Sequence, residues 1–482
     1  MKLRELLAGV PICAGSADLE MEISGVSYDS RTTRPGDLFV AMTGFATDGH
    51  QYIAKALANG AAAVLCQRRP AEACAYVQTE DSRRALAVIG GNWFGHPAEE
   101  MTMIAVTGTC GKTTTTYLLK AILEQARGAK VGLIGTNQNM IGSDVIPTER
   151  TTPESFEVQK LFREMADAGC THVVMETSSH ALYLDRVYGV RYDVGIFTNL
   201  TQDHLDFHKT MENYCDAKAI LFRNCVTGVV NADDPWTPRL LKDADCKVMT
   251  YAEQADADLR AENIVLSAGG IAFDAVSGAE RAPIRVNIPG GFMVYNTLDV
   301  LGAALALGIS LEESAAVLEK VPHVKGRVEI VPTPGKDYTI LIDYAHTPDS
   351  MVNVLQTVKE FAKGRTVAVF GCGGDRDRTK RPLMGKAAAD WSDFAVVTTD
   401  NPRTEEPEAI IADILPGFDG SATPYHVVVD RIEAIHWAMD HAETGDVIVL
   451  CGKGHETYQE VNHVKHHMDE REIVADYLSS GR

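Results

Sequence analysis

The sequence predicts an α/β protein that is divided into three domains. Short apolar, β-branched runs alternate along the chain with stretches of helical periodicity, a pattern typical of parallel sheets covered by helices. The chain has 482 residues, and length alone suggests about three domains. Hydrophobic residues make up 45% and charged residues 23% of the chain, a composition that excludes a disordered or collagen-like protein.

The predicted strands are short, and helical patterns separate many of them. Strands are expected at 103–106, 131–134, 172–175, 194–198, 228–231, 339–342, 366–370, 394–398 and 447–451, with helices at 114–125, 155–168 and 296–307. In an open parallel sheet, ligands bind outside the carboxyl ends of the strands. Polar residues that directly follow these runs are therefore the candidates for function.

Two breaks that contain proline suggest the domain boundaries. The first is the acidic stretch 96–100, just before the strand that begins near Met101, and the second is the stretch 321–327. The predicted domains are therefore 1–99, 100–324 and 325–482.

The charge and cysteine content limit the partners and the compartment. Lys and Arg number 45 against 66 Asp and Glu, a net charge of −21, so we expect neither nucleic acid nor an anionic membrane as a partner. The ten cysteines form no C-x-x-C pair, and some lie in apolar runs, as Cys66 and Cys451 do. No run approaches the roughly 18 apolar residues of a membrane-spanning helix. We expect a cytoplasmic monomer with reduced thiols.

A phosphate-binding loop is predicted directly after the strand at 103–107. Its residues are Gly108, Thr109, Cys110, Gly111, Lys112, Thr113 and Thr114, and a helix follows. Glycines let backbone amides face phosphate oxygens, Lys112 would neutralise their charge, and the Thr113 hydroxyl would reach Mg²⁺. Val106 stands where the common loop has its first glycine, so this is a shortened variant. The alternative is a glycine-rich turn with a surface lysine.

Three further residues of the central region are candidates for metal binding. Glu176 directly follows the predicted strand at 172–175 and could bind Mg²⁺ or, alternatively, cap the next helix. His204 lies in a cluster of ligand-type side chains at 199–208. Lys218 lies on a mostly apolar predicted helix and could simply extend to solvent. If it is partly buried, its lowered pKa would let it take up CO₂ and become an anionic Mg²⁺ ligand.

Three polar groups in the last third of the chain each follow a predicted strand. They are 371–381 with Arg376, then Asp400, Asn401, Pro402 and Arg403, and then 452–456 with Gly452 and Glu456. Each alone could be a solvated turn. Together they predict one crevice for a small charged molecule such as an amino acid.

In their order along the chain, these motifs resemble the Mur ligase family of peptidoglycan synthesis. The resemblance covers essentially the whole chain, and further motifs that carry it are 29–31, 35–41, 48–49, 176–180, 199–206, 216–218, 295–296, 326–327 and 343–348. It implies a UDP-substrate-binding domain at 1–99, a central P-loop-type ATP-binding domain at 100–324 and a C-terminal Rossmann-like, amino-acid-binding domain at 325–482. The implied reaction uses ATP and Mg²⁺ to phosphorylate a carboxylate, after which an amine attacks the acyl phosphate.

The resemblance also implies a role for individual residues. Gly108 to Thr114, with Asn296, Arg327 and Asp343, would bind ATP, and Thr113, Glu176, His204 and carbamylated Lys218 would surround Mg²⁺. Of these, Lys112, Lys218, Glu176 and His204 are the expected catalytic residues. Ser30, Thr151, Thr152, Ser178 and Arg186 would bind UDP-N-acetylmuramoyl-L-alanyl-D-glutamate. Arg376, Asp400, Asn401, Pro402, Arg403, Gly452 and Glu456 would bind the incoming amino acid.

The amino acid expected from the resemblance is meso-2,6-diaminopimelate. It is lysine with one further carboxylate, which Arg403 could bind with two hydrogen bonds, whereas lysine-adding members usually lack an arginine there. An L-lysine-adding ligase, a folylpolyglutamate-synthase-like ligase and a catalytically inactive binding module are the alternatives. Asp29-Ser30-Arg31 argues against the second of these, and the combined nucleotide, metal and amino-acid motifs argue against the third. The chain departs from the usual family pattern at Cys110, at 290–293 and at Leu184.

Overall fold

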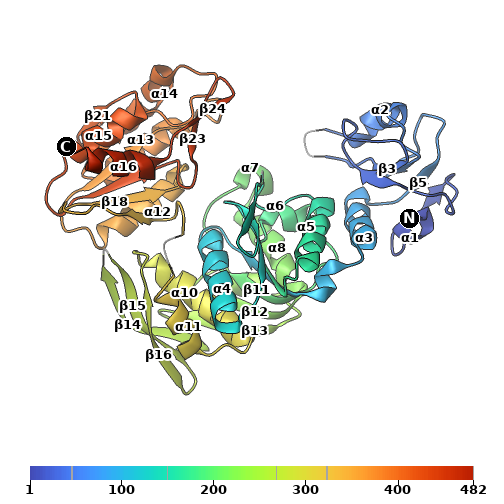
Figure 1. The fold of residues 1–482 in the computed structure, drawn as a ribbon, viewed down its shortest axis with the longest axis horizontal. Coiled ribbons are helices and arrows are strands. Elements are labelled where there is room, and N and C mark those ends of the chain that lie inside the picture. Colours follow the sequence, from blue (N-terminus) through green and yellow to red (C-terminus); the bar gives the residue numbers. More distant parts are fainter. Residues whose placement is uncertain (45–46, 149, 268, 322–323, 481–482) are drawn as a thin grey trace. The chain divides into compact units, whose positions relative to one another are not determined.

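The computed structural model describes residues 1–44, 47–148, 150–267, 269–321 and 324–480. The chain forms two compact units, Met1–Tyr251 with Gly302–Gly308 and Ala252–Leu301 with Ile309–Arg482. Figure 1 labels helices and strands of both units. This division coincides with neither predicted domain boundary, and the limits of the three domains stay a prediction. Pro322 and His323, within the second predicted break, lie outside the described residues.

The first unit begins with a small five-stranded sheet in the order β1-β5-β4-β3-β2. Its elements are α1 (Leu3–Leu6), β1 (Ala14–Gly15), β2 (Gly25–Ser27), β3 (Asp37–Val40), η1 (Gly49–Tyr52), α2 (Ile53–Ala58), β4 (Ala63–Cys66), β5 (Tyr76–Gln78) and α3 (Ser82–Phe94). Side chains of a strand alternate between the two faces of its sheet. Leu38 and Val40 therefore pack with α1 and α3, whereas Phe39 packs with α2 on the other face.

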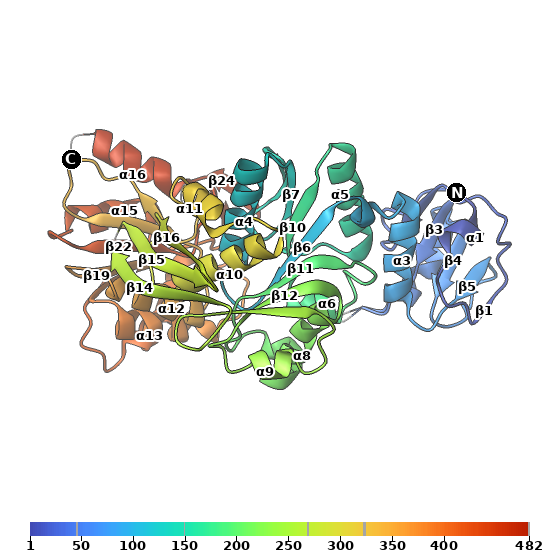
Figure 2. The same ribbon diagram turned by 90° about the horizontal axis from the view of Figure 1, so that it is seen from below.

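A larger sheet follows, in which the central strand β6 lies between the parallel strands β10 and β11. The elements are η2 (Pro97–Glu100), β6 (Thr102–Thr107), α4 (Lys112–Arg127), β7 (Val131–Ile134), β8 (Asn139–Ile141), β9 (Asp144–Ile146), α5 (Ser155–Asp167), β10 (His172–Glu176), α6 (Ser179–Tyr183), β11 (Tyr192–Phe197), α7 (Leu205–His208), α8 (Met211–Ala219), η3 (Ile220–Arg223), β12 (Cys225–Asn231), α9 (Thr237–Leu240) and β13 (Lys247–Ala252). Figure 2 shows the order β12-β11-β6-β10-β7.

The register of this sheet brings three strand ends together at one edge. Glu176 pairs with Val106, and Phe197 pairs with Thr107. Met103 and Ala105 join the core beneath α5, while α4 contacts β6, β7 and β10. The segments that follow β6, β10 and β11 therefore lie side by side, as expected for a ligand site in a parallel sheet.

The second unit begins with an antiparallel meander that the sequence did not predict. It consists of β14 (Leu259–Ser267), β15 (Gly270–Ser277) and β16 (Glu280–Val286), and α10 (Phe292–Ala306) and α11 (Leu311–Leu318) follow along the chain. The expectation of parallel sheets is therefore wrong for this segment and for the antiparallel strands β8 and β9. Short hairpin connections, as at Gly278 (φ +58°), allow antiparallel pairing without a crossover helix.

The last part of the chain is a doubly wound sheet in the order β17-β18-β22-β19-β20-β21. The elements of this part are β17 (Glu329–Val331), β18 (Thr339–Asp343), α12 (Pro348–Lys359), β19 (Thr366–Phe370), α13 (Lys380–Trp391), β20 (Phe394–Val397), α14 (Pro407–Ile414), η4 (Leu415–Phe418), β21 (Tyr425–Val427), α15 (Arg431–Asp440), β22 (Val447–Cys451), β23 (Tyr458–Val461), β24 (Val464–His467) and α16 (Glu470–Ser479). Strands β23 and β24 form a separate two-stranded sheet. Helices α12, α13 and α14 cover one face, and α15 and α16 cover the other. This arrangement is Rossmann-like.

Each strand that the sequence predicts corresponds to a strand of the structure. The predicted strands at 131–134, 366–370 and 447–451 have the bounds of β7, β19 and β22, and the other predicted strands overlap strands of the structure. All ten cysteines are free thiols, and Cys66 and Cys451 are buried as expected. Among the described helices, none combines the length and the apolar character that crossing a membrane would require.

Candidate active site

The loop after β6 has a backbone that only glycine permits at two positions. Gly108 has φ +149°, and a Cβ there would lie 1.8 Å from Thr198 Oγ1. Gly111 has φ +89° and immediately precedes α4. Lys112 is the first residue of this helix, and its Nζ donates to the carbonyls of Gly108 at 3.0 Å and Thr109 at 2.7 Å. The ammonium group therefore lies over the loop, and a phosphate bound there would meet both Lys112 and the helix N-terminus.

Residues after β11 hold the exposed tip of this loop. Asn199 Oδ1 accepts from the Cys110 amide at 3.0 Å, and Asn199 Nδ2 donates to the Cys110 carbonyl at 3.2 Å. Thr198 Oγ1 donates to the same carbonyl at 2.7 Å. These contacts involve the Cys110 backbone and not its thiol, so they do not depend on the side chain at this position.

Glu176 is buried, with 1% of its surface exposed, and is held by two threonines. Its Oε1 accepts from Thr113 Oγ1 at 2.9 Å and from the Thr136 amide at 2.9 Å. The Thr136 hydroxyl donates to Oε2 at 2.9 Å. The helix-capping alternative is wrong, because Ser178 caps α6 instead. Hydroxyl and carboxylate oxygens are the ligands that Mg²⁺ prefers, so Thr113 and Glu176 fit this ion.

Lys218, on α8, is also buried and has only 1% of its surface exposed. Its Nζ donates to the Gly108 carbonyl at 2.7 Å and lies 4.4 Å from the centre of the Tyr214 ring. Burial and, secondarily, the charge of Lys112 lower the pKa of Lys218 well below its usual value. The alternative of a lysine extending to solvent is therefore wrong. A neutral amine can react with CO₂, which fits the predicted carbamate.

His204 is placed differently from the other proposed metal ligands. It precedes α7 with φ +53°, and 47% of its side chain is exposed, 3.4 Å from Asp203. Its ring is 4.9 Å from the His180 ring and 6.1 Å from the Tyr214 ring. The part of the chain that the structure describes holds no cluster of three or more His, Cys, Asp and Glu side chains arranged for a metal. The side chain of Asp206 lies outside that part.

Four of the five predicted UDP-substrate residues lie together beside Glu176. Thr151 Oγ1 is 2.9 Å from Thr136 Oγ1, and Thr152 Oγ1 donates to the Glu176 carbonyl at 2.9 Å. The Ser178 amide donates to Thr152 Oγ1 at 3.2 Å, and Arg186 Nη1 donates to the Thr152 carbonyl at 3.1 Å. Ser30 is buried in the amino-terminal part, where its carbonyl accepts from Asn59 Nδ2 at 2.7 Å.

Arg186 belongs to a group of charged residues whose other members, Arg83 and Glu154, the sequence did not indicate, and which joins this region to the amino-terminal part. The carboxylate of Glu154 lies 3.6 Å from Arg83 Nη1 and 3.5 Å from Arg186 Nε. Burial raises the pKa values of both Tyr28 and Glu157, which are hydrogen-bonded to each other. The one sequence feature that could have indicated Glu154 is its position directly after Thr151-Thr152-Pro153, which include two predicted substrate residues.

In the second unit, two of the predicted nucleotide residues, Asn296 and Asp343, are buried, and Arg327 is half-buried. Asp343 accepts from the amides of Val328 and Ala345, each at 2.8 Å. Burial raises the pKa of Asp343, and the nearby Arg327 opposes this shift. The guanidinium of Arg327 lies 5.5 Å from the centre of the Tyr344 ring. Asn296 lies on α10, and its Nδ2 donates to Met293 Sδ at 3.8 Å.

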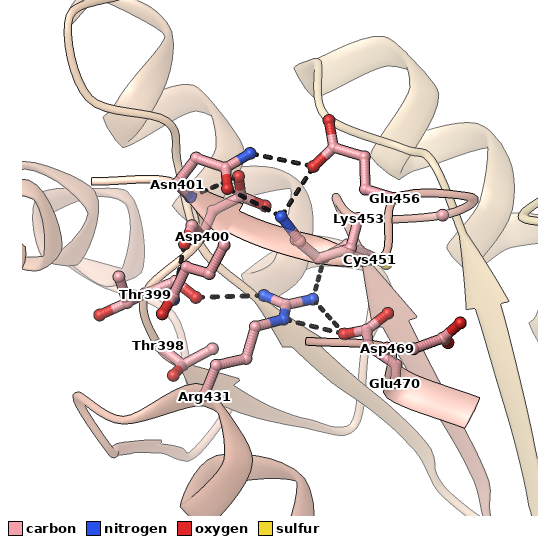
Figure 3. Close-up of polar contacts among 12 residues, drawn as sticks. Thr398, Thr399, Asp400, Asn401, Arg431, Cys451, Lys453, Glu456, Asp469 and Glu470 are labelled. Carbon is pink, nitrogen blue, oxygen red and sulfur yellow. Dashed lines mark hydrogen bonds and ion pairs between the residues drawn. The ribbon is translucent and has the colours of Figure 1, made fainter. Parts of the chain in front are cut away.

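The three polar loops of the last sheet meet, as the sequence predicted. The Gly374 amide donates to the Asn401 carbonyl at 2.9 Å, and Lys453 Nζ donates to Asn401 Oδ1 at 2.8 Å. Figure 3 shows Asn401, Lys453 and Glu456 in direct contact. At Gly452, a Cβ would lie 2.5 Å from Asp400 Oδ2, and at Gly374 a Cβ would lie 1.9 Å from the Pro402 carbonyl oxygen. The φ of +110° at Gly452 and the close approach to the backbone at Gly374 both require glycine.

The two predicted arginines of this site differ in their surroundings. Arg403 has φ +53°, and it donates from Nε to Glu460 Oε2 at 3.1 Å and from Nη1 to the Gly374 carbonyl at 2.8 Å. Arg376 is exposed, and it has no hydrogen bond or ion pair with any residue that the structure describes. Arg403 is therefore fixed in orientation, whereas Arg376 is not.

A buried arginine that the sequence did not indicate holds the strand ends beneath these loops. Arg431 donates to the carbonyls of Thr399 at 3.4 Å and Cys451 at 2.8 Å, and to Glu470 Oε1 at 2.8 Å (Figure 3). It therefore joins the carboxyl ends of β20 and β22 to the start of α16. These contacts position the loops that contain Asp400 and Gly452.

Comparison with protein families agrees with this architecture. Residues 22–92 match the "Mur ligase family, catalytic domain" model, residues 106–304 match the "Mur ligase middle domain" model, and residues 326–454 match the "Mur ligase, glutamate ligase domain" model. The chain belongs to the Mur ligase family. Mur ligases are ATP-dependent, ADP-forming enzymes that use Mg²⁺, so the loop at Lys112 and the Thr113–Glu176 pair lie in an enzyme of that class.

Individual relatives are similar over nearly the whole chain. The UDP-N-acetylmuramoyl-L-alanyl-D-glutamate–2,6-diaminopimelate ligase of Clostridium botulinum is 49% identical, over 95% of this chain and 95% of the relative. Ligase 1 of the same name from Clostridium acetobutylicum is 47% identical over 99% of both chains. A solved structure of a UDP-N-acetylmuramoyl-L-alanyl-D-glutamate–2,6-diaminopimelate ligase matches this Mur ligase with a TM-score of 0.73 and 33% identity, covering 100% of this chain and 99% of that one.

Proposed function

We propose that this Mur ligase joins meso-2,6-diaminopimelate to the D-glutamate of UDP-N-acetylmuramoyl-L-alanyl-D-glutamate, forming ADP and phosphate from ATP in peptidoglycan precursor synthesis. The observation that carries this function is the 49% identity to the ligase of Clostridium botulinum over 95% of both chains. Because the similarity extends through all three matched regions, it includes the loops around Lys112, Thr152 and Asn401.

The chemistry requires two successive transfers. The glutamate carboxylate takes the terminal phosphoryl group of ATP, which releases ADP and leaves an acyl phosphate. The amine of diaminopimelate then attacks the acyl carbon, loses a proton and expels phosphate. Bound Mg²⁺ would neutralise phosphate charge during the first transfer. The protein must therefore orient a carboxylate, a nucleotide and an amine, and counter the negative charge that develops.

We assign the first transfer to residues of the first unit. Lys112 and the amides from Gly108 to Thr114 bind the phosphates, a role supported by the position of Lys112 Nζ over the loop carbonyls. Thr113, Glu176, carbamylated Lys218 and His204 are the proposed Mg²⁺ ligands, and burial of Glu176 and Lys218 supports two of them. Thr151, Thr152, Ser178, Arg186 and Ser30 bind the UDP-linked dipeptide in this proposal.

We assign amino-acid binding to the three loops of the last sheet. Arg403 and Arg376 would bind carboxylate, and Glu456 would bind an ammonium group, with Asp400, Asn401, Pro402 and Gly452 shaping the site. The fixed guanidinium of Arg403 supports its assignment. Asn296, Arg327 and Asp343, all in the second unit, are also proposed to bind the nucleotide.

The domain limits, oligomeric state and location are part of the same proposal. The family matches at 22–92, 106–304 and 326–454 support domains at 1–99, 100–324 and 325–482. Ten free thiols suit a reducing compartment, which supports the cytoplasm. We propose a monomer, which light scattering of the purified protein would test.

Phosphate release from ATP tests the function directly. Each acceptor, UDP-N-acetylmuramoyl-L-alanyl-D-glutamate or a folate, is combined with diaminopimelate, L-lysine or glutamate. We expect release only with the UDP-linked dipeptide and, at low concentration, only with diaminopimelate. Lys112→Ala is the negative control, with release reduced about a hundredfold or more. Turnover with a folate acceptor, or a preference for lysine, would overturn the proposal.

A further inference from the structure

Lys453 is a fully buried lysine with no role in the site as assigned so far. Its exposed fraction is 0%, and it lies in the loop that follows β22. Nζ donates to Glu456 Oε2 at 2.7 Å and to Asn401 Oδ1 at 2.8 Å, as Figure 3 shows. Because removing an ammonium group from water is costly, a lysine is retained at such a position only with partners of this kind.

These contacts fix two residues that are proposed to bind the amino acid. Asn401 Oδ1 accepts from Lys453 and from the Glu460 amide at 2.9 Å, so the amide oxygen has one orientation. Asn401 Nδ2 consequently faces Glu456 and donates to Oε2 at 2.9 Å. Both donors thus meet the same oxygen of the Glu456 carboxylate, and Figure 3 shows the other oxygen pointing away from them.

The ion pairs of this site are balanced. Lys453 pairs with Glu456, and Arg403 pairs with Glu460 at 3.1 Å. These four side chains therefore present no excess of negative charge. A ligand end with one ammonium and one carboxylate keeps this balance, with the ammonium at Glu456 and the carboxylate at Arg403. A ligand end with an ammonium alone adds an uncompensated positive charge beside Lys453.

We infer that Lys453 is a positioning residue that orients Asn401 and Glu456 and that favours an amino acid whose distal end is zwitterionic over one whose distal end is only cationic. The inference rests on the proposed function, because it takes these loops as the amino-acid site. It adds a second determinant of selectivity to Arg403, one that acts through Glu456 and the local charge balance without touching the substrate.

Replacement by an uncharged side chain of similar length tests this role. In Lys453→Met, we expect KM for diaminopimelate to rise about 10- to 100-fold, the scale of one or two hydrogen bonds to charged groups, while KM for ATP and for the UDP-linked dipeptide stays unchanged. The ratio of kcat/KM for diaminopimelate to that for lysine should fall about tenfold or more, because the site gains negative charge.

Lys465 offers a matched control. Its Nζ lies 4.1 Å from the centre of the Tyr458 ring, and Lys453 Nζ lies 5.1 Å from the same ring. Lys465 is exposed and does not contact Asn401 or Glu456 in the described structure. Lys465→Met should therefore leave all three KM values and the selectivity unchanged.

A second comparison decides the question even if Lys453→Met does not fold. Glu456→Gln leaves Lys453 without its carboxylate, whereas the double variant Lys453→Met/Glu456→Gln removes both charges, a change that buried pairs tolerate better. We expect the diaminopimelate-to-lysine ratio to be lower in the double variant than in Glu456→Gln.

Two results would show that Lys453 only supports the fold. One is an equal diaminopimelate-to-lysine ratio of kcat/KM in Glu456→Gln and in the double variant. The other is an equal rise in KM for diaminopimelate, ATP and the UDP-linked dipeptide in Lys453→Met. Failure of the unmodified enzyme to use diaminopimelate would instead overturn the proposed function.

Discussion

The hydroxyl of Thr136 donates to Glu176 Oε2 at 2.9 Å, and this hydroxyl oxygen, Thr136 Oγ1, also lies 2.9 Å from Thr151 Oγ1. One side chain therefore touches a proposed Mg²⁺ ligand and a proposed substrate residue. The carboxylate of the substrate must reach the phosphoryl group beside the metal, and this contact joins the two proposed sites within the first unit.

Thr136→Val should raise the Mg²⁺ concentration that the enzyme requires and should also lower its stability. The variant keeps the amide that donates to Glu176 Oε1 but loses the hydroxyl, so one buried oxygen is left without its donor. We expect a loss of about 1–3 kcal/mol in the free energy of unfolding and a higher Mg²⁺ concentration for half-maximal activity. Thr136→Ser, which retains the hydroxyl, is the control. An unchanged Mg²⁺ requirement in Thr136→Val would contradict the link.

Lys218→Ala should reduce ligation about a hundredfold or more, because the proposed role belongs to a carboxylate that the lysine carries. Added bicarbonate cannot modify alanine, but a short carboxylic acid such as acetate should restore part of the activity by occupying the vacated space. Lys218→Arg keeps a positive charge but is not expected to form the carbamate. Full activity in Lys218→Arg, measured by phosphate release, would show that no carbamate is needed.

The sequence predicted the parts of the fold and of the site that depend on local pattern. Apolar runs such as 131–134 and 366–370 have the bounds of β7 and β19, because a buried parallel strand has no polar face. The loop at Gly108 and the polar groups that follow β19, β20 and β22 were also readable, since strand ends at one edge of a parallel sheet must converge.

What the sequence did not predict depends on tertiary contacts. Lys453 and Arg431 look like ordinary surface cations, and only their surroundings show that they are buried against Glu456 and Glu470. Glu460 lies 57 residues from Arg403, so no local pattern could pair them. The meander from β14 to β16 pairs through hairpins, and its alternation was too weak a signal beside the apolar runs.

Protonation of Glu405 at low pH should weaken the contacts that hold the loop carrying Arg376. The hydrogen bond from the Arg381 side chain and, secondarily, the hydrogen bond from the Asp375 amide lower the pKa of Glu405 from 4.5 to about 2. A group whose pKa is lowered by folding stabilises the folded state above its unfolded pKa, and this contribution is lost as pH falls from about 4.5 to about 2.

The contribution of Glu405 can be isolated by substitution. Glu405→Gln should lower the melting temperature at pH 7, and its difference from the unmodified protein should shrink as pH falls through that window. Asp390→Asn, which removes an exposed partner of Lys386, is the control and should show little difference at either pH. A Glu405→Gln difference that is constant with pH would contradict the ion pair.

Arg403→Ala should remove the partner of the second carboxylate of diaminopimelate. Truncating one side of a desolvated charge pair costs about 2–5 kcal/mol, a loss of about 30- to several-thousand-fold in kcat/KM for diaminopimelate. Lysine lacks that carboxylate and should lose little, so the preference between the two amino acids should narrow. KM for ATP and for the UDP-linked dipeptide should not change.

Two further variants separate the contact with substrate from the support that Arg403 receives. Glu460→Gln should produce a smaller loss, because the bond from Arg403 Nη1 to the Gly374 carbonyl still orients the guanidinium. Arg378→Ala removes an exposed arginine that pairs with Glu405 and should leave selectivity unchanged. If Arg403→Ala keeps a high selectivity for diaminopimelate, Arg403 is not the selector. The exposed Arg376 would then be the next cation to replace, because it carries the other guanidinium proposed for this site.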